Sequence, residues 1–159
     1  MCPSNALREA EDRCIGREHF HKADYLEATL TGIPAADRRL ARLRRRNPLR
    51  AHIAAVYLLE MRAAIIELWR VLAPGGHVVF VAGDNHVGGT PFRTSAFLRQ
   101  MFKSIGFRTR LRLVDAIHSR GLMTKRNKTA ALITREWVFL FQKPRTARRA
   151  VSERTWSRN

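Results

Sequence analysis

The stretch His52–Asn85, HIAAVYLLEMRAAIIELWRVLAPGGHVVFVAGDN, decides the fold that we expect for this chain. Apolar residues recur in its first half at steps of three and four, at Ile53, Tyr57, Met61, Ala64, Ile65, Leu68 and Leu72. This spacing predicts an amphipathic helix of about six turns with one apolar stripe. Pro74 cannot continue the helix and Gly75–Gly76 allow a reversal. The nearly all-apolar run His77–Ala82 is typical of a strand that is covered on both faces.

A helix, a short turn and a buried strand together make half of a parallel α/β unit. In open α/β sheets, ligands bind beyond the carboxyl ends of the strands. Gly83, Asp84 and Asn85, followed by Gly88–Gly89, occupy that position, so they are the first candidates for a binding pocket. The alternative stays open that these residues only turn the chain toward the next helix.

The composition of the chain favours a polyanionic partner. The 159 residues include 30 Lys and Arg against 13 Asp and Glu, which gives a formal net charge of +17. Nucleic acid is the usual partner of such a charge, and we expect DNA, with RNA as an alternative. Cys2 and Cys14 are too few for a disulfide framework or a cysteine zinc site. Because no run of about eighteen apolar residues occurs, we expect a soluble, cytoplasmic protein that has no membrane partner.

Residues 1–50 are expected to form a basic, mainly helical arm. Its segment 37–50, DRRLARLRRRNPLR, holds seven arginines and a single acid, and the spacing of Leu40 and Leu43 predicts a helix that is broken before Pro48. Arginine forks bind phosphate oxygens. The candidates for contact with the nucleic-acid backbone are Arg38, Arg39, Arg42, Arg45, Arg46 and Arg50. The alternative is a solvated basic face. His19 and His21 lack a third ligand nearby, so no metal site is predicted.

The partial α/β domain is expected to span residues 51–144. Residues 95–105 form a helical pattern that Thr94 can cap and Gly106 can close. In residues 107–113, arginines alternate with Phe107, Thr109, Leu111 and Leu113, as in a strand with one solvent-exposed face, and residues 136–142 form a second strand. Because no helix separates these two strands, we expect an antiparallel hairpin at the end of a mostly parallel sheet. The basic tail, residues 145–159, is expected to be disordered.

Residues 15–143 resemble the C-terminal portion of the DNA methyltransferase-like group of class I S-adenosylmethionine-dependent methyltransferases, which methylate the N4 of cytosine or the N6 of adenine. The motifs that carry the resemblance are Ile15-Gly16-Arg17-Glu18, Arg50-Ala51, Tyr57 with Met61, Arg70-Val71-Leu72-Ala73-Pro74-Gly75-Gly76, Val81-Ala82-Gly83-Asp84-Asn85, Thr94, Gly106-Phe107, Arg120, Arg126-Asn127 and Glu136–Lys143. The RVLxPGG turn is common to many class I methyltransferases. Its combination with GDN, Arg-Asn and Glu-Trp-Val indicates this group.

The resemblance implies a Rossmann-like, seven-stranded sheet whose last strand is inserted antiparallel. Val78–Ala82 would be the fifth strand, Phe107–Val114 the sixth and Ala131–Gln142 the seventh. It also implies the cofactor S-adenosylmethionine and a DNA substrate. On the loop between the last two strands, Arg120, Lys125, Arg126 and Asn127 are candidates for contact with the substrate, although they would equally suit an ordinary polar loop.

Two segments of the family are absent from the sequence. These enzymes hold the cofactor with a glycine-rich loop after the first strand, and hold the target amino group with a Pro-Pro-Tyr loop after the fourth strand. Neither segment occurs here, so no catalytic or cofactor-binding residue can be assigned and the N-terminal strands of the sheet are missing. We therefore expect the isolated chain to be an inactive, truncated or split form, with an N-terminal half or another complementing chain as a further partner.

Two alternatives to this reading stay open. The first is a non-catalytic, basic nucleic-acid-binding module that grips phosphates with the arginines of residues 38–50 and with the tail. The second is a fragment that does not fold stably alone, because the fifth strand would expose an unpaired edge and apolar faces. That fragment would aggregate or depend on a partner.

Overall fold

The computed structural model describes residues 9–117 and 135–145, and these residues form an α/β protein. They belong to two compact units, which we describe separately. Unit 1 contains residues 9–62 and 85–92, and unit 2 contains residues 63–84, 93–117 and 135–145. The units divide inside a helix, whereas the predicted arm ends at residue 50. Residues 146–159 of the predicted tail lie outside the described residues.

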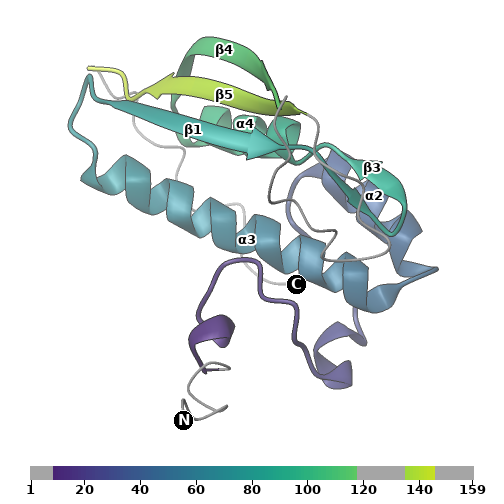
Figure 1. The fold of residues 1–159 in the computed structure, drawn as a ribbon. Coiled ribbons are helices and arrows are strands. Elements are labelled where there is room, and N and C mark those ends of the chain that lie inside the picture. Colours follow the sequence, from purple (N-terminus) through teal and green to yellow (C-terminus); the bar gives the residue numbers. More distant parts are fainter. Residues whose placement is uncertain (1–8, 118–134, 146–159) are drawn as a thin grey trace, which may run out of the picture. The chain divides into compact units, whose positions relative to one another are not determined.

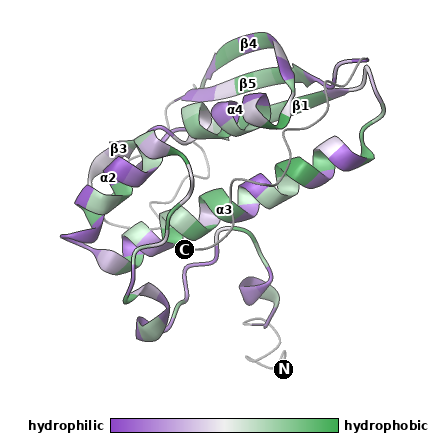
Figure 2. Ribbon diagram, turned by 180° about the vertical axis from the view of Figure 1, so that it is seen from behind, coloured by the Kyte–Doolittle hydropathy of each residue, from purple (hydrophilic) through white to green (hydrophobic). Residues whose placement is uncertain are grey.

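Unit 1 combines helices with a small hairpin. It contains the 3-10 helix η1 (Lys22–Tyr25), the helix α2 (Pro34–Arg44) and the first part of α3 (Pro48–Val71). Strands β2 (Asn85–Val87) and β3 (Thr90–Phe92) pair antiparallel. Pro34 at the start of α2 has a backbone angle that suits the first helical position. Ala36, Leu40 and Leu43 of α2 are buried, and its ribbon is otherwise largely hydrophilic (Figure 2).

The break between α2 and α3 confirms the predicted interruption before Pro48, but α3 begins earlier than the expected start at His52. The side chain of Asn47 accepts a hydrogen bond of 3.0 Å from the backbone N–H of Arg50, as an N-cap residue does. Pro48 then occupies the first helical position, where its missing N–H costs nothing. The same proline that ends one helix therefore begins the next.

The long helix α3 is confirmed, but most of its predicted apolar stripe is wrong. Ile53, Tyr57, Met61, Ala64, Leu68 and Leu72 are only half-buried, and Ile65 alone of the predicted set is buried. The apolar residues that are buried on α3 are Ala51, Ala54, Ala55, Leu58 and Ile65. They also follow three- and four-residue steps, so the buried face is rotated from the expected one. Alanines carry little weight in a hydrophobic pattern, yet their small side chains let neighbouring segments approach the helix closely.

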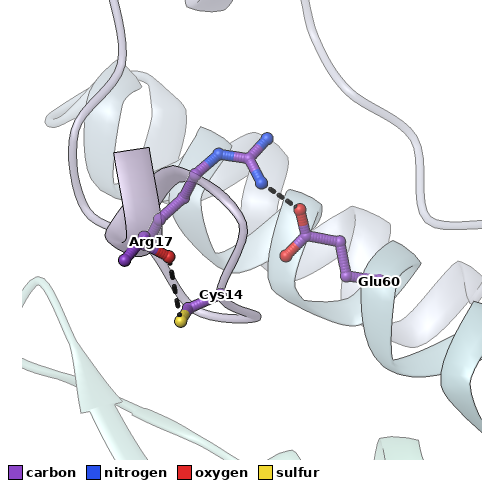
Figure 3. A network of polar contacts seen from close by, with 4 residues as sticks. Cys14, Arg17 and Glu60 are labelled. Atoms are coloured by element: carbon purple, nitrogen blue, oxygen red, sulfur yellow. Dashed lines mark hydrogen bonds and ion pairs between the residues drawn. The ribbon is translucent and has the colours of Figure 1, made fainter. Parts of the chain in front are cut away.

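Within unit 1, two ion pairs tie the N-terminal segment to α3. The guanidinium of Arg17 pairs with the carboxylate of Glu60 (Figure 3). Arg50 donates to Glu18 over 3.0 Å. Gly16, which precedes Arg17, has a φ of +90°, and a Cβ at this position would lie 3.7 Å from the ring of Tyr57. The segment Gly16–Glu18 is thus held along one part of α3.

Unit 2 is built around a three-stranded sheet. Its strands are β1 (His77–Gly83), β4 (Arg108–Ala116) and β5 (Arg135–Gln142), in the spatial order β1-β5-β4 (Figure 1). The pairs β1–β5 and β4–β5 are both antiparallel. Phe139 of β5 lies opposite Phe80 of β1 and opposite Arg112 of β4. Because β5 runs antiparallel to both of its neighbours, β1 and β4 point in the same direction.

The expected antiparallel pairing of the last two strands is confirmed. The expectation of a mostly parallel sheet is wrong for the described residues, since no two of their strands pair in parallel. The physical reason is the position of β5. It lies between β1 and β4, which share one direction, and so separates the two strands that would otherwise form a parallel pair.

Helix α4 (Thr94–Ile105) covers one face of this sheet, and the predicted helix over residues 95–105 is confirmed, with a start one residue earlier than expected. Phe97, Leu98, Met101 and Phe102 are buried, and Gly106 closes the helix with a φ of +122°. The ring of Phe102 stacks on Phe141 with centroids 4.0 Å apart. It also contacts the rings of Phe80 at 5.2 Å and Phe107 at 5.1 Å. This aromatic cluster is the core of unit 2.

The opposite face of the sheet is apolar and exposed, which corrects two expectations. Strand β1 was expected to be covered on both faces, but Val79 is 67% and Val81 50% exposed. On β4, a bulge between Thr109 and Leu111 reverses the alternation, so Leu111 and Leu113 lie on the same exposed face. Arg112 lies instead on the face that α4 covers, with its guanidinium 3.8 Å from the ring centre of Trp137. The periodicity of β4 predicted a strand, but all of its residues are exposed, and the bulge changed only the face of the sheet on which Leu111, Arg112 and Leu113 lie.

The Pro-Gly-Gly turn after α3 is bonded to the end of β5. Gly75 N–H donates to the carbonyl of Lys143 over 2.8 Å, and Lys143 N–H donates to the carbonyl of Gly76 over 2.9 Å. The ammonium of Lys143 also donates to the carbonyls of Trp69 at 2.6 Å and Leu72 at 2.8 Å. A cation suits the C-terminus of a helix, where carbonyl groups lack partners. Lys143 therefore caps α3 and connects it to the last strand.

Candidate functional site

The first predicted candidate, Asp84, lies at the end of β1 and contacts two other elements of unit 2. Its Oδ1 accepts hydrogen bonds from the backbone N–H of Ser95 over 3.0 Å and from the Ser95 hydroxyl over 2.7 Å. Its Oδ2 accepts a hydrogen bond of 3.3 Å from the indole N–H of Trp137 on β5. Ser95 is the second residue of α4, so Asp84 caps this helix in the way that was expected of Thr94.

These contacts account for Asp84 without any ligand. They favour the alternative in which the Gly83-Asp84-Asn85 segment shapes the chain path, since both carboxylate oxygens hold neighbouring elements together. Gly83 is the last residue of β1, and Asn85 is the first residue of β2, with an exposed side chain. The sequence did not reveal the partners Ser95 and Trp137. No local signal could have found this cap, because Thr94 already offered a capping side chain at the helix start.

The loop candidates Arg120, Lys125, Arg126 and Asn127 lie outside the described residues, so their predicted contact with the substrate stays a prediction.

The six predicted phosphate-contacting arginines have different surroundings in unit 1. Arg39 donates to the backbone carbonyl of Pro91 on the hairpin, and Arg50 pairs with Glu18. Arg44, which was not a candidate, donates to the carbonyls of Tyr25 and Leu26. The remaining candidates have exposed side chains without a hydrogen bond or ion pair to any described residue: Arg38, Arg42, Arg45 and Arg46.

A groove lies between α2 and the β2–β3 hairpin. Its volume is about 460 Å³, and its lining residues are Arg39, Arg42, Leu43, Arg45, Arg46, Val87, Gly88, Thr90, Pro91 and Phe92. Four predicted phosphate-contacting arginines thus line one groove, whereas Arg38 and Arg50 are not among its lining residues. We call it the arginine groove.

The turn of the hairpin consists of two glycines, and Gly88 approaches α2 closely. Gly88 has a φ of +58° and Gly89 a φ of +76°, which suits the tight turn of a two-residue hairpin. A Cβ on Gly88 would lie 2.5 Å from the Cδ1 of Leu43, so a larger residue at this approach would force the Leu43 side chain to move. The hairpin was not predicted, although a Gly-Gly pair between short extended segments was a usable signal.

The arginine groove carries positive charge without a counter-charge. None of the described residues that line it is acidic. Arginine side chains are protonated at every physiological pH, so these guanidinium groups repel one another until an anion approaches them. Apolar side chains, among them Leu43, Val87 and Phe92, lie beside the arginines in the lining. The groove can therefore accept a phosphate together with the less polar group to which it is attached.

A second cavity of unit 1, with a volume of about 700 Å³, holds charges of both signs. Its lining residues are Asp12, Arg17, His19, Phe20, His21, Asp24, His52 and Val56. Within the described ranges, no group of three or more His, Cys, Asp or Glu side chains has an arrangement that could hold a metal ion.

The imidazole of His52 is buried in this part of unit 1. Its Nδ1 lies 3.0 Å from the hydroxyl of Thr29, and the ring of Phe20 meets it edge-on with centroids 4.7 Å apart. Burial lowers the pKa of His52 from its ordinary value of 6.5, with Asp24 opposing this change and Arg17 and Arg44 adding to it. The folded protein therefore favours the neutral imidazole.

We expect the stability of the protein to fall in weak acid because of His52. The pKa of His52 is lower in the folded state than in the unfolded state. The neutral imidazole therefore makes its full contribution to the free energy of unfolding above about pH 6.5, and this contribution is lost as the pH falls below that value. Urea unfolding from about pH 7.5 to about pH 5.5 should show a larger loss of stability for the unaltered protein than for His52→Asn, which cannot titrate. Parallel pH profiles for the two proteins would contradict this assignment.

No model of a known protein family, no curated protein and no solved structure matches the chain. None of the helices in the described parts of the chain is both long enough and apolar enough to cross a membrane.

Proposed function

We propose that this chain is the C-terminal portion of a DNA methyltransferase-like, S-adenosylmethionine-dependent class I methyltransferase, and that it contributes nucleic-acid contacts to an enzyme whose cofactor and catalytic loops lie elsewhere. The observation that carries the proposal is the strand order β1-β5-β4, in which the last strand is inserted antiparallel between two strands of one direction. This is the arrangement that the resemblance implies for the fifth, seventh and sixth strands. Helix α4 connects β1 to β4 and covers one face, as a crossover helix does.

Contacts between the motifs of the resemblance support the proposal. In unit 2, the turn Pro74–Gly76 is bonded to Lys143, the last residue of the closing motif, and Gln142 donates to the carbonyl of Gly75 over 3.2 Å. Asp84 of the GDN motif is bonded to Trp137 of the same closing motif. In unit 1, the Ile15–Glu18 motif reaches Arg50 through the Glu18 ion pair. Within each unit, motifs that are distant in the sequence are thus joined by hydrogen bonds or ion pairs.

The uncovered side of the sheet supports the idea that further strands and helices complete it. Val79 and Val81 of β1 and Leu111 and Leu113 of β4 lie on this face and are about half exposed or more. The outer edge of β1 has no pairing strand among the described residues. Exposed apolar faces and open strand edges favour association with another segment. An N-terminal half of the methyltransferase sheet would cover both.

The described residues do not fit the cofactor. The sequence has no glycine-rich loop after a strand that precedes residue 51, and β1 is the first strand of the described chain. Asp84 is the polar side chain at the end of that strand, and its two oxygens already bond Ser95 and Trp137. S-adenosylmethionine would supply the methyl group in the completed enzyme. We assign no catalytic step to any residue of this chain.

A second candidate function is a non-catalytic nucleic-acid-binding module. The arginine groove favours it, because several of its guanidinium groups have no partner among the described residues and none of its lining residues is acidic. The two functions differ in what must accompany the chain. Only the methyltransferase requires a complementing N-terminal portion.

The coding sequence upstream of Met1 tests the proposal. We expect it to encode, in frame or in an adjacent gene, a glycine-rich loop after the first strand of the sheet and a Pro-Pro-Tyr-type motif after the fourth strand. Absence of both motifs would contradict the methyltransferase proposal and leave the binding module as the function.

A further inference from the structure

We infer that the arginine groove binds the phosphate backbone of a nucleic-acid strand, with Arg42, Arg45 and Arg46 on the phosphates and Arg39 as the residue that positions the hairpin. The inference deepens the proposed function, from which it takes nucleic acid as the partner, and it assigns the contact to one place in unit 1. Arg38 and Arg50, which the sequence also suggested, do not belong to this place.

The different contacts of the arginines separate these roles. Arg39 is half-buried and donates a hydrogen bond to the Pro91 carbonyl, and this bond holds β3 against α2. Arg42, Arg45 and Arg46 have exposed side chains and no partner among the described residues. Their guanidinium groups are free to form bidentate bonds with phosphate oxygens. Arg50 is already neutralised by Glu18.

The spacing of the three free arginines suits consecutive phosphates. Arg42 and Arg45 are three residues apart and Arg42 and Arg46 are four apart, so they lie on neighbouring turns of one helix face. The N–H groups of Arg46 and Asn47 still bond the carbonyl of Leu43, which extends the helical path past the end of α2. A rise of about 1.5 Å per residue spreads these side chains over about 6 Å, before their own length is added. Phosphates of one duplex strand follow one another about every 3.4 Å along the helix axis, so this span faces about two consecutive phosphates before the length of the side chains is added.

The other wall of the groove limits what can bind. Val87, Pro91 and Phe92 are apolar, and Gly88 brings the hairpin into contact with Leu43. An isolated inorganic anion would use only the arginines. A strand also presents sugars and bases, which can lie against the apolar wall. The groove therefore favours a polynucleotide over free phosphate.

The test is a salt titration of binding, read by the anisotropy of fluorescent oligonucleotides in single-stranded and duplex form. The variant is Arg42→Gln, Arg45→Gln and Arg46→Gln together. The matched control removes the same charge from exposed arginines of unit 2, as Arg99→Gln, Arg108→Gln and Arg110→Gln together. Each lost phosphate contact should reduce the slope of log K against log salt by about 0.7 to 0.9. The groove variant should therefore lose about two units of slope or more, and on the order of 100-fold in affinity at about 0.15 M salt.

The outcomes separate the inference from the proposed function. A control variant that changes both slope and affinity much less than the groove variant supports the groove. Equal losses in the two variants would overturn the groove while leaving nucleic-acid binding intact. Failure of the unaltered chain to bind either oligonucleotide would contradict both the inference and the nucleic-acid part of the proposed function.

A single substitution tests the positioning role of Arg39. Arg39→Ala should weaken binding by loosening the hairpin, while the salt slope stays unchanged because no phosphate contact is lost. A loss of about one unit of slope would overturn this role and place Arg39 on a phosphate. Circular dichroism of each variant shows whether the helices remain folded.

Discussion

Replacing Phe102 by alanine is expected to lower the free energy of unfolding of unit 2 by about 3–5 kcal/mol, the largest effect that we predict for a single substitution. The side chain is fully buried and lies at the centre of the aromatic cluster. Its ring stacks on Phe141 with an interplanar angle of 8° and meets Phe80 and Phe107 at steeper angles. Alanine would leave a cavity and remove these ring contacts, each worth about 0.5–1.5 kcal/mol beyond the buried area.

The measurement is urea unfolding followed by tryptophan fluorescence, since Trp69 and Trp137 both lie in unit 2. Phe102→Leu serves as the control, because it keeps most of the volume and loses only the ring, and it should cost less than about 2 kcal/mol. If Phe102→Ala does not fold, the leucine variant still tests the cluster. If the alanine variant lowers the free energy of unfolding by less than about 1 kcal/mol, Phe102 is not at the centre of the core.

The second large effect is expected at Asp84. Asp84→Ala should destabilise the protein by about 2–4 kcal/mol, because it removes an acceptor of three hydrogen bonds and leaves Ser95 and Trp137 without their partner. It also removes a negative charge from the N-terminus of α4, where the helix dipole favours one. The same urea titration measures the loss.

Two control variants separate a structural role of Asp84 from ligand binding. Asp84→Asn keeps an oxygen for Ser95 but presents an amide N–H to the indole N–H of Trp137, so it should cost about 1–2 kcal/mol. Asn85→Ala, at an exposed neighbour, should cost less than about 0.5 kcal/mol. A normal stability of Asp84→Ala combined with a loss of nucleic-acid binding would contradict the structural role and restore Asp84 to the candidate pocket.

Local signals in the sequence were enough to predict several elements. The buried face of α4 follows from large apolar residues at helical spacing, and Gly106 marks its end. The strands β1 and β5 follow from apolar runs, and the Pro-Gly-Gly turn separates α3 from β1.

Other features depended on tertiary contacts that no local pattern contains. A single bulge near Arg110 reversed the faces of β4, so Leu111 lies on the face opposite α4 and Arg112 lies against Trp137. The buried face of α3 depends on alanines, whose burial is decided by what approaches them. The cap of α4 comes from Asp84, eleven residues before Ser95, and a propensity argument favoured the nearby Thr94.

The sequence located the candidate arginines but not their arrangement. The density of arginines in residues 38–50 predicts an anion-binding surface, and four of them line one groove. Their division into groove-lining, hairpin-positioning and salt-bridged residues required the positions of Pro91 and Glu18, which are distant in sequence. The wall opposite α2 comes from residues 87–92, beyond the whole of α3 and β1.

The central claim is that this chain completes a methyltransferase whose first half lies elsewhere, and cofactor binding tests it most directly. The measurement is thermal unfolding with increasing S-adenosylhomocysteine, for this chain alone and for the protein completed with the upstream-encoded segment. We predict no shift for the chain alone and a rise for the completed protein, where ligand at about 100 times its Kd adds about 2.7 kcal/mol. A completed protein that carries both motifs but gains no stability, or an equal gain by the chain alone, would contradict the claim.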